Sequence, residues 1–411
     1  MRKMKDSGVE WIGEIPTDWS MIRVKHAFIR KNQKAMQEEP IVLSLARSGV
    51  RVRDVSNNEG QVAESYFNYN PVEEGDLLLN PMDLYSGANC SISHIKGVIS
   101  PAYINLKSKE GINPVFYAYY FKVQYWLMAF FSYGKGVSFD NRWTLSVETL
   151  MNYPLVMPSY EEQCKRADFL ESECKKIDSI VNTQEKIIEK LKAYKLSFIN
   201  ESVNNNIGTK CHLGYVGIMK NGLNFSSTLD GKKIKFLGVG DFKNYFILND
   251  INMFSDILTN DEVSGEYMLR DGDIIFVRSN GSKELVGRAV MVKNVNYPLT
   301  YSGFCIRFRN MRTDIIDSNY ILYFFKSLDF RKQLEKNSQG SNINNVNQEL
   351  LSQIDFTFPD IELQRKVVCV LDDKCKKIDN VICNKGKLID KYVGYKKSLI
   401  YEVVTGKREL N

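Results

Sequence analysis

Residues capable of catalysis are few and scattered in this sequence. Its three histidines, His26, His94 and His212, leave little for general-base chemistry. The glycine-containing stretches YGKG at Tyr133 and VVTGK at Val403 lack the spacing of a phosphate-binding loop. No HExxH motif and no Ser/His/Asp arrangement stands out. The sequence therefore predicts a chain that catalyses no reaction by itself.

Two near-matches to functional motifs do not change this prediction. The stretch NPMD at Asn80 is closest to the Asn/Asp-Pro-Pro-aromatic motif of base-modifying methyltransferases, but it lacks the second proline and the aromatic residue. We interpret it as the end of a strand. Cys211 and His212 are adjacent but have no matching ligands, so we expect no metal site there.

Composition indicates an ordinary folded protein of two to three domains. The 411 residues are 44% hydrophobic and 12% aromatic, which is enough for ordinary cores. A net charge of +6 is compatible with a nucleic-acid partner without requiring one. The eight cysteines contain no CxxC pair, which favours a reduced, cytoplasmic compartment. No signal peptide or membrane-spanning run is expected, and hence no membrane partner.

One stretch of the chain occurs twice. Residues 158–203 return at 359–404 with a constant offset of 201 and no gap. The offset pairs Gln163 with Gln364, and the run CKKID is present in both copies. A 46-residue match without an insertion indicates two equivalent elements of fixed length.

Both copies have the seven-residue apolar spacing of a coiled-coil helix. About 40 helical residues would form a rod of roughly 60 Å, and two such rods most simply pack as an antiparallel pair. A polar residue at a matched position, Gln184 in one copy and Lys385 in the other, is expected to fix the register. The expected seam includes Leu170, Ile177 and Leu191 in the first copy and Leu371, Ile378 and Tyr392 in the second.

A mixed segment of strands and one aromatic helix precedes each copy, and the two segments are similar. The run GDLLLNP at Gly75 returns as GDIIFVR at Gly272, and the helical run PVFYAYYFKVQYW resembles NYILYFFKSLDF. Their polar loops differ. The predicted elements are strands at Ile41–Ala46, Asp76–Asn80, Cys90–Ile95, Gly97–Ser100 and Ala102–Lys107, a helix at Asn113–Phe131, and closing strands at Met151–Met157 and Leu351–Phe358.

The predicted fold class is α+β, with two similar mixed α/β domains separated by two long antiparallel helices. An apolar cluster around Trp11 and Trp19 in the N-terminal segment is expected to dock on the first domain or on the end of the helices. The expected boundaries are 1–157 for the first domain with its docking segment 1–24, 158–205 for the first helix, 206–358 for the second domain and 359–411 for the second helix.

With these features, the sequence resembles the specificity subunit of type I restriction–modification systems. The opening KDSGVEWIGEIPTDW and the ending VVTGK are similar to the termini of that family. The junctions YPLVMPSYEEQ and IDFTFPDIELQ resemble its paired IPxPPxxEQ motif. Both junctions lack the second proline, and Leu363 stands where the motif has Glu. The resemblance covers essentially the whole chain.

The resemblance implies a subunit that recognises double-stranded DNA through two target-recognition domains. Each domain would recognise one half of a split, asymmetric site, and the helical spacer would set the distance between the halves. Two methyltransferase (modification) subunits would bind the spacer and methylate adenine with S-adenosylmethionine. A restriction subunit with translocase activity can join them. This chain itself would bind no cofactor.

Under that resemblance, the loops that differ between the domains are the first candidates for DNA contacts, because arginine and asparagine pair bidentately with guanine and adenine. An alternating arginine run in domain one would place three guanidiniums on one strand face. The candidates in domain one are Arg47, Arg51, Arg53, Lys135, Ser138, Asn141 and Arg142. Those in domain two are Arg278, Ser279, Asn280, Lys283, Arg288, Asn342, Asn344 and Asn345.

Two other functions are compatible with parts of the pattern. The chain could be the recognition half of a split methyltransferase or endonuclease, which the missing catalytic motifs disfavour. It could also be a coiled-coil adaptor that joins two proteins without binding DNA. Two similar domains with unlike polar loops favour DNA recognition over both.

Overall fold

The computed structural model describes residues 2–55, 63, 65–82, 84, 90–136, 143–204, 208–225, 231–243, 245–260, 262–282, 284–337 and 345–410. The chain forms two compact units. Unit 1 comprises Met1–Gln184 and Lys387–Asn411, and unit 2 comprises Glu185–Gly386. Each unit contains one of the two mixed segments together with part of each long helix.

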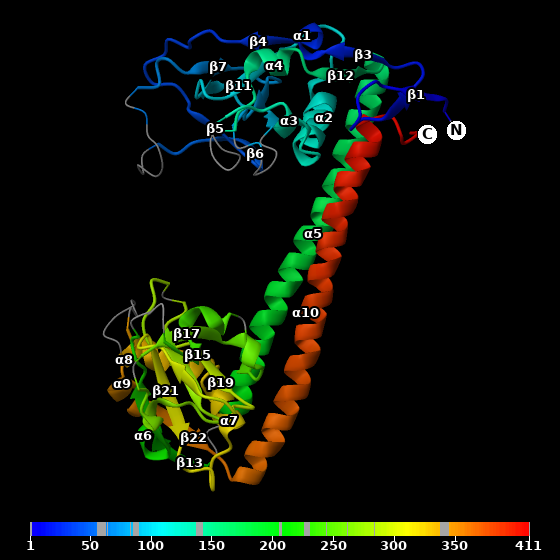
Figure 1. Cartoon of the computed structure of the whole chain (residues 1–411). Coiled ribbons are helices and arrows are strands. Elements are labelled where there is room, and N and C mark those ends of the chain that lie inside the picture. The colour runs from blue at the N-terminus through cyan, green and yellow to red at the C-terminus, as the bar shows by residue number, and fades with distance from the viewer. Residues whose placement is uncertain are drawn as a thin grey trace. The chain divides into compact units, whose positions relative to one another are not determined.

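Two long helices confirm the duplicated heptad pattern (Figure 1). Helix α5 covers Tyr160–Val203, and helix α10 covers Ile361–Val404. Each begins two residues after a proline, which cannot donate a backbone hydrogen bond within the helix. The expected seam is buried at Leu170, Ile177, Leu371 and Ile378 and partly buried at Gln184, Leu191, Lys385 and Tyr392.

Helices α5 and α10 run antiparallel within each unit. In unit 1, the ammonium of Lys396 on α10 lies 2.7 Å from the carboxylate of Asp178 on α5. In unit 2, Lys195 on α5 lies 2.7 Å from Asp379 on α10. The 201-residue offset relates these two ion pairs, so the same contact is made twice with the two helices exchanged.

A four-stranded antiparallel sheet forms the framework of unit 1, in the order β4-β11-β8-β9. These strands are Phe28–Lys31, Ile104–Ser108, Leu77–Leu79 and Cys90–Ile92. A hairpin of β5 (Leu43–Ala46) and β6 (Gly49–Val52) and the pair of β7 (Asn70–Val72) and β10 (Gly97–Ile99) lie in the same unit. The short helix α1 (Val24–Ala27) precedes β4, and α2 (Pro114–Trp126) buries a row of aromatic side chains, namely Phe116, Tyr117, Tyr120, Phe121 and Tyr125.

Unit 2 repeats this sheet and adds one strand, in the order β14-β21-β18-β19-β16. The five strands are Gly217–Asn221, Cys305–Asn310, Ile274–Val277, Ala289–Val292 and Ile247–Leu248. A second sheet joins β17 (Ser255–Thr259), β15 (Lys232–Leu237) and β20 (Leu299–Tyr301). The shorter helices of the described residues in this unit are α6 (Leu213–Val216), α7 (Ser318–Phe324), α8 (Leu328–Asn337) and α9 (Gln348–Ser352), with three 3-10 turns, η1 (Val239–Phe242), η2 (Ile251–Met253) and η3 (Gly265–Tyr267).

One buried glutamine in each unit joins the start of the long helix to the aromatic helix. The amide oxygen of Gln163 accepts from the backbone N–H of Asn113 (2.8 Å), and that of Gln364 accepts from Asp317 (2.9 Å). Each amide nitrogen also donates to the carbonyl of the proline before its own helix. Asn113 and Asp317 are the N-caps of α2 and α7. Each mixed segment is thereby fixed to its own long helix by the same contact.

Three predicted elements are wrong in extent. The expected helix at 113–131 is two helices, α2 and α3 (Ala129–Ser132), because Met128 between them adopts a φ of 58°. The expected strands at 151–157 and 351–358 begin in short helices, α4 (Val147–Met151) and α9 (Gln348–Ser352). The strands themselves are β12 (Pro154–Met157) and β22 (Asp355–Phe358), which pair with β3 (Ser20–Arg23) and β13 (Thr209–His212). A capping side chain, Ser146 or Asn347, starts each short helix, which the apolar pattern alone does not reveal.

The N-terminal segment docks on both of its expected surfaces. It contains a hairpin of β1 (Met4–Asp6) and β2 (Glu14–Pro16), and the side chain of Trp19 is buried beyond it. The ring of Trp19 packs edge-on against Phe116 of α2, with centroids 6.4 Å apart. The hydroxyl of Tyr401 on α10 donates to the carbonyl of Ile12 (3.3 Å).

Candidate nucleic-acid interface

In unit 2, three of the candidate residues meet where strand β18 ends. The backbone N–H of Arg278 donates to the carbonyl of Phe304 (2.8 Å), and its carbonyl accepts from Val346 (2.9 Å). The next residue, Ser279, forms an antiparallel bridge with Asn345. Two strand-like segments distant in sequence therefore present Arg278, Ser279 and Asn345 together.

Two more candidates line a hollow of about 280 Å³ beside that strand end. Asn280, Arg288 and Lys243 provide its polar side chains, while Phe242 and Val277 contribute apolar ones. The amide oxygen of Asn280 accepts from the backbone N–H of Ser282 (2.8 Å), which orients its side chain. Burial lowers the pKa of the Arg288 guanidinium, which is partly exposed. The hollow combines apolar walls with hydrogen-bond donors, as the edge of a nucleobase requires.

The equivalent strand end in unit 1 shares one of these backbone hydrogen bonds and has different side chains. The carbonyl of Pro81, at the position of Arg278, accepts from the N–H of Leu145 (2.8 Å), the counterpart of Val346. Lys135 is exposed, and its backbone forms two 2.9 Å hydrogen bonds with Thr144. The framework is thus repeated at this point, whereas the side chain offered to a ligand is not.

The expected row of three guanidiniums on one strand face is wrong. Strands β5 and β6 form a hairpin, and Arg47 lies in the turn between them. Arg51 is the one arginine of the run within a strand, where its guanidinium donates to the Ser44 hydroxyl (3.4 Å). Arg53 follows the end of β6. The alternation pattern assumed a continuous strand, whereas the chain reverses direction within the run.

Six of the candidates lie outside the described residues. These are Ser138, Asn141, Arg142, Lys283, Asn342 and Asn344.

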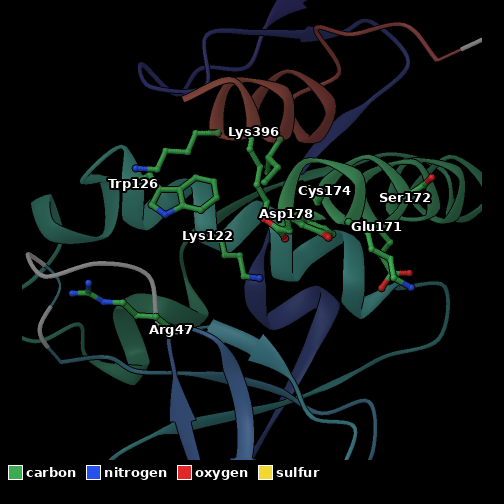
Figure 2. Close-up of a pocket in the computed structure, with 12 residues that line it drawn as sticks. Arg47, Lys122, Trp126, Glu171, Ser172, Cys174, Asp178 and Lys396 are labelled. Carbon is green, nitrogen blue, oxygen red and sulfur yellow. The ribbon is translucent and has the colours of Figure 1, made fainter. Parts of the chain in front are cut away.

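A cleft of about 990 Å³ opens in unit 1 between the β5–β6 hairpin, α2 and the paired long helices (Figure 2). Arg47 borders it from the hairpin, and Lys122 and Trp126 line it from α2. Five cationic side chains and two carboxylates contribute to the lining, so its net charge is positive. The lining residues are Arg47, Tyr119, Lys122, Trp126, Glu171, Ser172, Cys174, Lys175, Asp178, Lys396, Lys397 and Ile400.

Aromatic rings accompany the cations of this cleft. The ammonium of Lys397 lies 5.7 Å from the ring centre of Trp126, and that of Lys122 lies 5.3 Å from the ring centre of Tyr119. Burial raises the pKa of the Cys174 thiol, which is therefore neutral at pH 7. A positive cleft with aromatic walls suits the phosphate backbone of a nucleic acid.

Sequence reasoning did not identify Lys122, Trp126 or Lys397 as candidates. The sequence does contain a pattern that indicates this site. Spacings of three and four residues place Tyr119, Lys122 and Trp126 on one face of α2. The aromatic content of this helix pointed instead to burial. Lys397 lies on α10 outside the apolar seam, and its relation to α2 depends on how the helix packs in unit 1.

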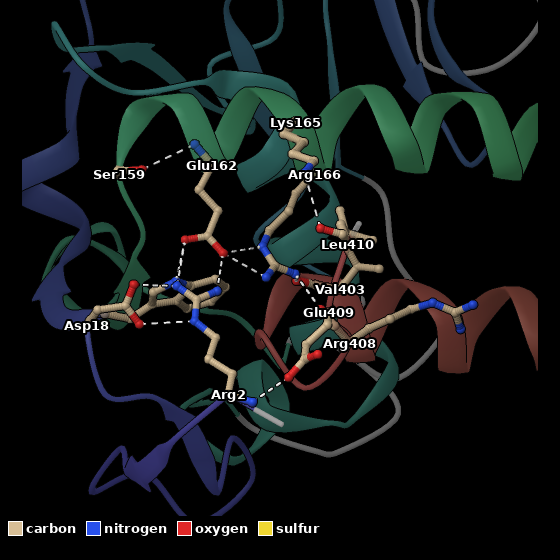
Figure 3. A network of polar contacts seen from close by, with 11 residues as sticks. Arg2, Asp18, Ser159, Glu162, Lys165, Arg166, Val403, Arg408, Glu409 and Leu410 are labelled. Carbon is tan, nitrogen blue, oxygen red and sulfur yellow. Dashed lines mark hydrogen bonds and ion pairs between the residues drawn. The ribbon is translucent and has the colours of Figure 1, made fainter.

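A partly buried polar cluster surrounds Glu162 at the start of α5 in unit 1 (Figure 3). The carboxylate of Glu162 accepts from Arg166 (2.7 and 3.0 Å), the Trp19 indole (2.8 Å) and Arg2 (3.1 Å). Arg166 also donates to the carbonyl of Val403 on α10 (2.9 Å). Burial alone would raise the pKa of Glu162, but these hydrogen bonds outweigh it and lower the pKa to about 2. The cluster joins both terminal segments of the chain to α5.

Among the described residues, no group of three or more His, Cys, Asp or Glu side chains could hold a metal ion. All eight cysteines are free thiols. A search of the described helices found none that is long and apolar enough to cross a membrane.

Comparisons with known proteins point to one family. Residues 211–385 match the family model for the type I restriction modification DNA specificity domain. The StySPI specificity subunit of Salmonella potsdam is 25% identical over 279 residues, which is 64% of this chain and 58% of that protein. The MjaVIII specificity subunit of Methanocaldococcus jannaschii is 21% identical over 427 residues, covering 96% of this chain and 93% of that protein.

Solved structures show the same fold. The HsdS subunit from Thermoanaerobacter tengcongensis aligns with a TM-score of 0.54 at 13% identity, over 96% of this chain and 98% of that chain. A chain from a structure addressing complex assembly and conformational transition of the type I R-M system aligns with a TM-score of 0.74 at 13% identity, over 96% and 99% of the two chains. These matches show that residues 211–385 are similar to that specificity domain, and that the chain shares its fold with the solved HsdS subunit.

Proposed function

We propose that this chain recognises a bipartite, asymmetric site in double-stranded DNA, with one unit for each half, and that it catalyses no reaction itself. The observation that carries the proposal is one framework built twice with unlike side chains at equivalent strand ends. Arg278 in unit 2 stands where unit 1 has Pro81, although both backbones make the same hydrogen bond. Repetition of the framework with exchange of the side chains is what two recognition sites for different sequences require.

Base recognition in unit 2 is assigned to the strand end with Arg278 and to the adjacent hollow. Arginine pairs bidentately with guanine and asparagine with adenine, and Arg278, Asn280 and Asn345 supply both types of donor. In unit 1, the corresponding contact would come from Lys135. Arg47, Arg51 and Arg53 lie on or beside the β5–β6 hairpin, where they suit phosphate contacts better than base contacts.

The long helices are the proposed docking surface for two modification subunits, which would carry S-adenosylmethionine. Exposed apolar side chains on both helices support this, since such surfaces mark protein interfaces. Examples are Ile180, Tyr194, Val370, Val381 and Tyr395. The helices would also set the separation of the two half-sites, and a restriction subunit could join the assembly.

A gel-shift titration of the purified chain, with and without a modification subunit, tests the proposal. Binding should weaken steeply as salt rises, because phosphate contacts release counterions. Replacing Arg278 by Ala should weaken binding to the cognate duplex by about 1–3 kcal/mol and relax specificity at one position. A chain that binds the modification subunit but no DNA would instead be a coiled-coil adaptor.

A further inference from the structure

Of the phenylalanines that the structure describes, Phe304 is the one with an exposed side chain, at 56%. It lies in unit 2 between β20 and β21. A single exposed apolar side chain is common on protein surfaces and by itself indicates nothing. Two further observations single out this ring, namely the hydrogen bonds that fix its backbone and its place beside Arg278.

Hydrogen bonds hold the backbone of Phe304 on both sides. Its N–H donates to the hydroxyl of Ser302 (3.2 Å), and its carbonyl accepts from the N–H of Arg278 (2.8 Å). A Cβ at Gly303 would clash with the side chain of Asn224, so glycine allows the turn to pack this closely. The ring is thereby presented from a fixed turn, which reduces the entropy lost when a ligand contacts it.

The turn also lies against the arginine to which base recognition is assigned. One guanidinium nitrogen of Arg278 lies 3.5 Å from the carbonyl of Gly303. Ser279 follows Arg278 and bridges to Asn345. The end of β18 therefore presents an apolar ring next to polar side chains of the kind that pair with base edges.

The same turn occurs in unit 1 without the ring. The N–H of Ala102 donates to the hydroxyl of Ser100 (3.4 Å), as that of Phe304 does to Ser302. Each serine carbonyl also accepts from the backbone N–H three residues further on (3.0 Å in unit 1 and 2.8 Å in unit 2). Ala102 is exposed, as Phe304 is. The backbone of the turn is thus repeated, and unit 2 has an aromatic ring where unit 1 has a methyl group.

Two side chains differ together between the units at this place. Unit 2 has Arg278 and Phe304, whereas unit 1 has Pro81 and Ala102. Proline also lacks the N–H with which Arg278 holds the carbonyl of Phe304. The guanidinium and the ring therefore belong to one arrangement that only the second unit has at these positions.

Thymine is the base whose edge suits such a ring. Its C5-methyl group is apolar and points into the major groove, where phenylalanine is one of the side chains that contact it. The polar edges of the other bases would lose hydrogen bonds to water against a ring that cannot replace them.

We propose that Phe304 packs against the C5-methyl group of a thymine next to the base that Arg278 contacts, and that unit 2 thereby selects thymine at that position. The inference rests on the proposed function. It adds an apolar contact, specific for one base, to the polar contacts already assigned to the end of β18.

The test measures fluorescence anisotropy of the full chain with its modification subunit, on the duplex selected from a random pool. Arg278→Ala identifies the half-site of unit 2, because it relaxes specificity there. Deoxyuridine then replaces each thymine of that half-site in turn, which removes one methyl group and keeps base pairing. At one position the replacement should weaken binding about fivefold. Replacement of thymines outside both half-sites should leave binding unchanged.

Variants of Phe304 connect this methyl effect to the ring. Phe304→Ala should bind the thymine duplex about fivefold more weakly and bind both duplexes equally, since ring and methyl group act through one contact. Phe304→Leu keeps an apolar side chain and should remain sensitive to the methyl group. Tyr215→Ala is the control, because Tyr215 is 64% exposed and lies in α6, beside the opposite end of β21. It should show the full methyl effect.

A methyl effect that is present in the native chain and absent in Phe304→Ala supports the inference. The inference is overturned, while DNA recognition stands, if both chains show the same methyl effect. A unit 2 half-site without thymine, or one in which no thymine is sensitive to the replacement, overturns it as well. If the native chain binds no DNA, the proposed function itself fails.

Discussion

Units 1 and 2 differ least in the contacts that fix their backbones. Gln163 and Gln364 make the same two hydrogen bonds, and the closing segments make the same backbone contact through Leu145 and Val346. They differ most where side chains face a cleft or a terminal segment. The same backbone framework therefore occurs in both units with different surface side chains, as two recognition sites on one chain require.

The start of the long helix shows the divergence most clearly. Glu162 and Arg166 form a partly buried polar cluster in unit 1, whereas the equivalent positions in unit 2 are Leu363 and Val367. The cluster is present where the terminal segments of the chain meet α5. The segments around Arg2 and Val403 that the cluster joins to α5 both belong to unit 1.

Replacing Glu162 by Ala should have the largest effect on stability. Arg166 is 2% exposed and would be left without its carboxylate, which should cost about 3–5 kcal/mol of unfolding free energy. The matched change Leu363→Ala in unit 2 should cost less than about 1 kcal/mol, since that side chain is 36% exposed. Chemical denaturation of both variants measures the difference. Equal losses of unfolding free energy in the two variants would mean that the first turns of α5 and α10 contribute equally to stability.

The same cluster should make stability depend on acid pH. The pKa of Glu162 is about 2 in the folded chain, below its ordinary value of 4.5. Its contribution of about 2–3 kcal/mol should therefore be complete above pH 4.5 and decline as pH falls toward 2. Denaturation of the native chain and Glu162→Gln across this range provides the measurement. A stability difference that stays constant with pH would contradict the assigned role of the carboxylate.

Removal of the shared glutamine contact should destabilise both units by the same amount. Gln163→Ala and Gln364→Ala each remove hydrogen bonds to buried backbone groups and should each cost about 1–3 kcal/mol. Hydrogen exchange of α2 and α7 would show which unit loosens. Clearly unequal losses of unfolding free energy would show that the two glutamine contacts are not equivalent.

The unit 1 cleft should contribute modestly and without sequence preference to DNA binding. Lys122→Gln and Lys397→Gln should each reduce affinity by about 1 kcal/mol for any duplex and lower the salt slope by about one. Lys176→Gln is a suitable control, because Lys176 pairs with Glu173 and does not line the cleft. If the control weakens binding as much as the cleft variants, the cleft is not the phosphate site.

The repeat made the helices and the glutamine pairing predictable. A gap-free offset constrains both copies at once, so the lengths of α5 and α10 and the equivalence of Gln163 and Gln364 follow from pattern alone. The arginine run at 47–53 shows the limit of such patterns. Alternation predicts a strand face only if the strand continues, and here a turn interrupts it.

The candidate site was predictable only in part. Arg278, Ser279 and Asn345 meet at one strand end, which sequence proximity could not show for residues 67 positions apart. Lys122 and Lys397 become neighbours of one cleft because α2 packs beside α10 in unit 1.

The central claim is that two units on one chain recognise different half-sites. Selection of duplexes from a random pool by the purified chain with its modification subunit tests it most directly. The account predicts enrichment of two short, unlike sequence elements at one fixed separation, with Arg278→Ala relaxing only one of them. Enrichment of a single uninterrupted sequence, or no enrichment at all, would contradict it.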